Sequence, residues 1–149
     1  MSTKIKLYFK EFPSPELMAR GVSIRSIRLF AEIRFKTHDG WTNPYSAILD
    51  TGAPACVIPF KIWSRCEVNL LADYTLRGII PKEECSLPVL VGKLVCVLVD
   101  RERESDEFSI RAYLTLTDEV PLMLGFDGLL EETRLCMNYQ QKEAFLETI

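Results

Sequence analysis

An acidic residue directly follows an apolar segment in the first third of the chain. Residues 47–49 are apolar, and the residues after them are Asp50, Thr51, Gly52 and Ala53. A carboxylate at the end of a buried strand is costly unless a partner or a reaction uses it, so Asp50 is a candidate catalytic residue. Gly52 lets the backbone turn sharply close to that carboxylate. Hydrolysis of an amide without a metal ion or a covalent intermediate needs two carboxyl groups, and Asp50 is a candidate for one of them.

The other residues that carry chemistry form weaker patterns. Ligands spaced as C-x-x-C are missing and the chain has one histidine, so we expect no zinc site and no cofactor. A cysteine–histidine pair of Cys56 or Cys136 with His38 has no local support, because His38 lies in a turn signal. The five cysteines are odd in number and form no close pair, which favours reduced thiols and a cytoplasmic location.

The composition predicts one globular domain over residues 1–149. Hydrophobic residues make up 48% of the chain and charged residues 26%, which excludes overall disorder. The net charge is −3, so no basic face is expected and nucleic acid is not a predicted partner. The first six residues contain no signal-peptide core, and the apolar stretch 87–99 is interrupted by Gly92 and Lys93, so no membrane association is expected.

Alternating apolar and polar residues predict many short strands. We expect a half-buried strand at 4–10 and a long strand at 22–35 with a bulge near residues 25–26. Further strands are predicted at 48–50, 57–59, 70–76, 87–98, 108–116, 122–125 and 134–139, with helical turns at 15–19 and 59–66. Asp127 is expected to cap a brief helix that ends at Glu132. Strands at such spacing predict an all-β barrel or sandwich.

A second apolar segment ending in glycine, residues 122–125, follows Asp50 at a separation of 125 − 50 = 75 residues. Together the two segments resemble the retropepsin-like aspartic proteases, over roughly residues 22 to 135. The resemblance implies an all-β fold, a closed β-barrel of the acid-protease type with one short helix near the C-terminal end. Asp-Thr-Gly occurs once, so the second carboxyl would come from Asp50 of another copy in a two-fold homodimer.

The resemblance also implies roles for the neighbouring residues. Thr51 would hydrogen-bond across the two-fold axis to the partner loop, and Gly52 would leave room for the substrate backbone. Ala53 would pack beneath the loop, while Leu124 and Gly125 would cross under it and support it.

A flap hairpin that clamps an extended peptide substrate is expected around Arg77, Gly78 and Ile79. Where retroviral members carry an ion pair, this chain has Pro54-Ala55 and Phe126, for which an apolar contact is expected. The predicted function is an aspartic endopeptidase that activates water between two Asp50 carboxyls. The alternatives are a dimeric peptide-binding module with weak or no catalysis on the same fold, and a general β-barrel interaction domain.

Overall fold

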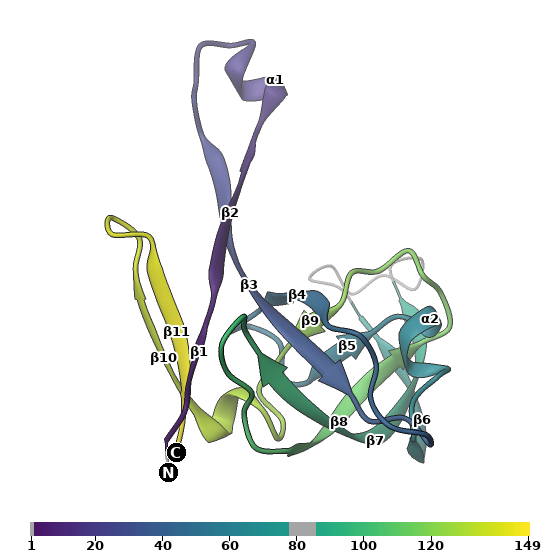
Figure 1. Cartoon of the computed structure of the whole chain (residues 1–149). Helices are drawn as coiled ribbons and strands as arrows, with labels where there is room; N and C mark the ends of the chain where they lie inside the picture. The colour runs from purple at the N-terminus through teal and green to yellow at the C-terminus, as the bar shows by residue number, and fades with distance from the viewer. Residues whose placement is uncertain (1, 78–85) are drawn as a thin grey trace.

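The computed structural model describes residues 2–77 and 86–149 and shows a chain built mainly from β-strands (Figure 1). The helical elements among these residues are short: α1 (Pro15–Met18), α2 (Phe60–Trp63) and the 3₁₀ helix η2 (Leu130–Glu132). The strands are β1 (Lys4–Lys6), β2 (Tyr8–Pro13), β3 (Arg25–Phe35), β4 (Tyr45–Leu49), β5 (Cys56–Ile58), β6 (Asn69–Leu76), β7 (Leu87–Val99), β8 (Phe108–Thr115), β9 (Met123–Leu124), β10 (Thr133–Asn138) and β11 (Glu143–Thr148).

Most strands belong to one sheet with the order β2-β3-β4-β9-β5-β8-β7-β6. The pairs β4–β9 and β5–β8 are parallel, and β9 also pairs antiparallel with β5. The long strand β3 pairs with β4 and, at its end, with β7. β9 therefore lies between the strands that precede and follow residues 50–55.

The core lies on one face of these strands, as the two-residue period of a strand requires. On β3 the side chains of Ala31, Ile33 and Phe35 are fully buried, and the residues between them are not. β8 repeats this pattern at Ile110 and Leu114. The apolar residues whose alternation predicted these strands are thus the residues that fill the core.

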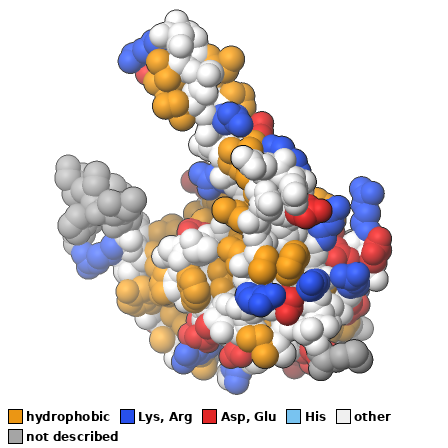
Figure 2. Space-filling model, turned by 90° about the vertical axis from the view of Figure 1, so that its left-hand side faces the viewer, with side chains coloured by type: hydrophobic (Ala, Val, Ile, Leu, Met, Phe, Trp, Pro, Cys, Tyr) orange, Lys and Arg blue, Asp and Glu red, His pale blue; other side chains and the backbone are white. Residues whose placement is uncertain are grey.

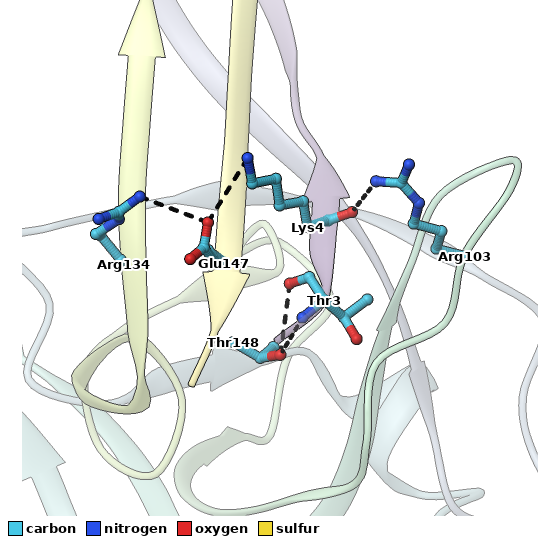
Figure 3. Close-up of polar contacts among 6 residues, drawn as sticks. All are labelled: Thr3, Lys4, Arg103, Arg134, Glu147 and Thr148. Atoms are coloured by element: carbon cyan, nitrogen blue, oxygen red, sulfur yellow. Dashed lines mark hydrogen bonds and ion pairs between the residues drawn. The ribbon is translucent and has the colours of Figure 1, made fainter. Parts of the chain in front are cut away.

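The two ends of the chain lie side by side in a second sheet with the order β1-β11-β10. The Thr3 N–H donates to Thr148 Oγ1 at 3.0 Å, and the Thr148 hydroxyl donates to the Thr3 carbonyl at 3.4 Å (Figure 3). The Thr148 N–H also donates to the Thr3 carbonyl, at 2.9 Å. The Glu147 carboxylate lies 3.9 Å from the Lys4 ammonium, and the Arg103 guanidinium donates to the Lys4 carbonyl at 3.0 Å. These contacts tie the terminal sheet together and to the loop after β7.

A hairpin of β2 and the first half of β3 projects from the body (Figure 1). We call residues 9–29 the arm; its strands pair from Phe9–Leu29 to Pro13–Arg25, and α1 lies in the connection. Ser14 caps α1 by accepting the Leu17 N–H at 3.4 Å, and proline occupies the first helical turn. No residue of α1 is buried.

The mainly β class and most strand positions predicted from the sequence are confirmed, with two corrections in the N-terminal third. The strand expected over 4–10 is divided at Leu7, because β1 pairs with β11 whereas β2 pairs with β3. The strand expected from residue 22 begins at Arg25. It pairs with β2 in continuous register, so the bulge expected near residues 25–26 is wrong.

The short helix predicted near the C-terminal end is the 3₁₀ helix η2, which begins at Leu130. Asp127 does not cap it, because the Asp127 carboxylate binds an arginine of β8 instead. Among the described residues, no helix has the length and apolar character needed to cross a membrane.

Candidate active site

Asp50 follows β4 directly, at the edge of the sheet where β9 also ends. Leu49 lies opposite Leu124 in the parallel β4–β9 pair, and the Asp50 N–H donates to the Leu124 carbonyl at 3.0 Å. Because parallel strands end at the same edge of a sheet, Asp50 and Gly125 are neighbours. The structure therefore brings together the two segments that are 75 residues apart in the sequence.

A tight turn fixes the direction of the Asp50 carboxylate. The Gly52 N–H donates to Oδ1 of Asp50 at 2.8 Å, and the Ala53 N–H donates to the Asp50 carbonyl at 3.2 Å. Asp50 and Ala53 are half-buried, whereas Thr51 and Gly52 are exposed. The Thr51 hydroxyl makes no hydrogen bond to another residue in 2–77 or 86–149 and is available to an outside partner.

Residues 124–127 support this turn from below through backbone bonds. The Phe126 N–H donates to the Ala53 carbonyl at 3.1 Å, and the Asp127 N–H donates to the Pro54 carbonyl at 2.9 Å. At Gly125 the backbones are so close that a β-carbon would lie 2.4 Å from the carbonyl oxygen of Ala55. Glycine is required there by close approach, and its N–H donates to the buried Cys56 thiol at 3.4 Å.

Arg111 on β8 holds this supporting segment, and the sequence analysis missed it. Its guanidinium donates to both carboxylate oxygens of Asp127, from Nε at 3.0 Å and from Nη2 at 2.7 Å. The Arg111 guanidinium lowers the pKa of Asp127, although partial burial acts in the opposite direction. The apolar contact expected between Pro54-Ala55 and Phe126 stays a prediction, and the structure has an ion pair one residue after Phe126. The only signal in the sequence was a cation at an outward position of an alternating strand.

A cavity of about 480 Å³ adjoins the Asp50 carboxylate. Its walls come from the base of the arm, the end of β4, the turn and β10, and they are mainly apolar. The residues that line it are Phe9, Ile27, Arg28, Leu29, Ile48, Leu49, Asp50, Thr51, Leu135, Met137 and Tyr139. Asp50 is therefore accessible from a hollow that accommodates apolar side chains.

A second cavity, of about 430 Å³, adjoins Ala55 at the end of the turn. It is bounded by Ala55, by Leu71 and Tyr74 of β6, and by the Arg111–Asp127 pair. The Tyr74 ring stacks on that of Tyr113, with centroids 5.8 Å apart. The middle of the β6–β7 hairpin and Ala55, at the end of the turn that carries Asp50, thus line the same cavity.

The flap prediction is tested only in part. Arg77 is exposed and directly follows β6, whose pairing with β7 ends at Leu76 opposite Leu87. Gly78 and Ile79 lie outside the described residues.

The described residues do not support a cysteine–histidine active site. Burial raises the pKa of the Cys56 thiol to about 11, and His38 is exposed in its turn. The described cysteines, Cys56, Cys66, Cys96 and Cys136, are free thiols. No group of histidine, cysteine and acidic side chains in the described ranges could hold a metal ion.

One solved structure similar to this chain is the crystal structure of a retropepsin-like aspartic protease from Rickettsia conorii. The alignment covers 99% of this chain and 93% of that chain, with a TM-score of 0.55 and 12% sequence identity. No protein-family model and no curated protein sequence matches the chain. At this identity the likeness shows the fold alone.

Proposed function

We propose that this chain is an aspartic endopeptidase that acts as a homodimer, with one Asp50 from each copy. The observation that carries the proposal is the turn at Asp50, whose carboxylate is oriented by Gly52, supported by residues 124–127 and open to an apolar cavity. The fold is similar to that of a retropepsin-like protease, which adds support. The proposal includes a closed barrel, supported by the pairing of β3 with both β4 and β7.

In the proposed dimer, the two Asp50 carboxyls bind one water molecule between them. Carboxyls about 3 Å apart cannot both ionise, so they share one proton and titrate as a pair. The ionised carboxylate takes a proton from the water, which attacks the peptide carbonyl carbon. The protonated carboxyl gives its proton to the carbonyl oxygen, which forms a tetrahedral diol. As the diol collapses, the first carboxyl passes the proton it took from water to the leaving nitrogen, the second carboxylate recovers a proton from a diol hydroxyl, and the C–N bond breaks.

The surroundings of Asp50 suggest the class of substrate. Apolar side chains dominate the adjoining cavity, so we expect peptides with bulky apolar residues beside the scissile bond. The exposed Thr51 hydroxyl is available for the bond across the two-fold axis. The free cysteines support a cytoplasmic location, which is part of the proposal.

The test is cleavage of a peptide library from roughly pH 4 to 7 by the wild type and by Asp50→Asn. Asp50→Asn should lower kcat by about 100-fold or more, because an amide cannot accept the proton from water. The matched control is Asp39→Asn, in an exposed turn, which should cleave like the wild type. Specific activity should rise as the protein concentration passes the dissociation constant of the dimer, which sedimentation measures independently.

Two results would contradict the proposal. One is equal cleavage by Asp50→Asn, and the other is a fully active monomer. A dimer that binds library peptides without cutting them would instead support the peptide-binding alternative on the same fold.

A further inference from the structure

The arm carries large apolar side chains that the described residues of its own chain leave exposed. Figure 2 shows hydrophobic side chains on the projecting arm and on the face of the body beneath it. The exposed fractions are 46% for Phe12, 55% for Met18, 40% for Val22, 61% for Ile24 and 41% for Ile27. Large apolar side chains left exposed together on one projecting element indicate a contact with another molecule.

The base of the arm belongs to the same hollow as the candidate catalytic residue. Phe9, Ile27 and Leu29 line the cavity together with Asp50 and Thr51. A second carboxyl that reaches Asp50 from another copy therefore brings that copy next to the base of the arm. The base of the arm therefore adjoins the surface that the proposed dimer must bury.

The arm is held in its projecting direction by contacts with Tyr139, which follows β10. The Phe9 ring meets the Tyr139 ring edge-on at 5.2 Å, and the Arg25 guanidinium donates to the Tyr139 hydroxyl at 3.1 Å. That hydroxyl donates to Glu11, which also lies 3.3 Å from the Lys142 ammonium. The arm is thus anchored at its base and along β2, while α1 at its tip is not buried.

The charges of the arm and of the rest of the chain have opposite signs. Residues 9–29 contain four lysines and arginines and two glutamates, so the arm carries +2. The whole chain carries −3, so the remaining residues carry −3 − 2 = −5. A second copy therefore offers the arm a surface of complementary charge, which favours this partner over a cationic one.

We propose that the arm of each copy packs its apolar side chains on the second copy and forms part of the interface that brings the two Asp50 residues together. The inference rests on the proposed function, because that function requires the dimer. A six-residue strand such as β2 spans about 20 Å, and the arm extends away from the body over that length (Figure 1). Two-fold symmetry places both arms in the interface, so each arm substitution acts twice.

The experiment compares dimer dissociation constants by sedimentation velocity. In the first variant, Met18→Glu and Ile24→Glu place charges on the arm at two positions that are exposed in the single chain. In the second, an Asn-Gly turn replaces residues 14–24 and closes the hairpin after Pro13 and before Arg25. The matched control is Leu116→Glu, because Leu116 is 57% exposed and lies outside the arm.

Both arm variants should raise the dimer dissociation constant by about 100-fold or more, and the control should not change it. Peptide cleavage at low protein concentration should fall in parallel and return at high concentration, because the arm does not touch the reacting atoms. Circular dichroism and thermal melting report whether each variant is folded, and the double glutamate variant keeps the backbone of the wild type.

The outcomes separate the two proposals. If the wild type is a dimer with Asp50-dependent cleavage and both arm variants dimerise as well as it does, the arm inference is overturned; the arm would then meet another protein or the substrate. If the wild type is a monomer without cleavage, the proposed function fails first. A wild-type dimer weakened only in the arm variants supports the inference.

Discussion

The close approach at Gly125 allows a quantitative prediction. A β-carbon at this position would lie 2.4 Å from the Ala55 carbonyl oxygen, 2.5 Å from the Ala55 carbonyl carbon and 2.7 Å from the Ala53 carbonyl oxygen. All three are backbone atoms, so no side chain can rotate away. The variant Gly125→Ala must therefore separate the turn at Asp50 from the segment that supports it.

The expected loss of stability follows from that separation. Forcing a methyl group into a packed site costs about 1–3 kcal/mol. The Phe126–Ala53 and Asp127–Pro54 backbone bonds, at 3.1 and 2.9 Å, are strained at the same time, and each contributes about 1 kcal/mol. With partial relaxation we expect Gly125→Ala to lower the free energy of unfolding by about 2–4 kcal/mol and Tm by roughly 5–15 °C.

Gly52→Ala is the matched control, because its β-carbon would contact only the Asp50 carboxylate, at 3.3 Å from Oδ1. It should change Tm by less than about 3 °C yet reduce cleavage, since the carboxylate has to shift. The assays are thermal and urea unfolding and peptide cleavage. A Gly125→Ala protein that melts within about 2 °C of the wild type would refute the argument that backbone contact makes this glycine necessary.

Two further predictions concern groups around the site. The Arg111 guanidinium lowers the pKa of Asp127 from its ordinary 3.8, so the pair stabilises the fold above that value and the contribution is lost as pH falls through the lowered pKa. In urea unfolding, Arg111→Gln should therefore be less stable than the wild type at neutral pH and should converge with it in acid; a difference that stays constant with pH would contradict this. In a Cys85→Ser background, Cys136 should react with a thiol reagent in the folded protein, because it is half-buried. Fast labelling of the buried thiols before unfolding would contradict the packing described for Cys56, Cys66 and Cys96.

The sequence predicted the parts of the site that depend on local pattern. Asp50 at the end of an apolar segment and Gly125 at the end of another were both recognisable, and strand alternation predicted most of the sheet. That the two segments are neighbours came from the resemblance, because a separation of 75 residues carries no periodic signal. The catalytic role of Asp50 remains a prediction, as do the flap roles of Arg77, Gly78 and Ile79.

Other features depend on contacts that a linear pattern does not contain. The residues between Glu11 and Ile24 include two prolines and scattered apolar positions, so the sequence predicts one helical turn at 15–19 and a strand from residue 22 but no projecting hairpin. The direction in which the hairpin leaves the body depends on Tyr139, which is 114 residues from Arg25. Arg111 was equally hidden, because its partner Asp127 had been assigned to a helix cap.

The hydrogen bonds around Asp50 indicate that folding of the turn and catalysis have different requirements. The backbone bonds that hold the turn, from Gly52, Ala53 and residues 124–127, all lie within one chain. A single copy can thus fold with its turn already oriented, yet it has only one carboxyl at that position. In the proposed dimer, the folding of a single copy does not depend on protein concentration. Cleavage does depend on it, because cleavage requires two copies. Substitution at Gly125 should impair both, Met18→Glu with Ile24→Glu at the tip of the arm should impair assembly alone, and Asp50→Asn should leave a folded dimer without chemistry. If all three variants changed the same quantity, this separation of roles would be wrong.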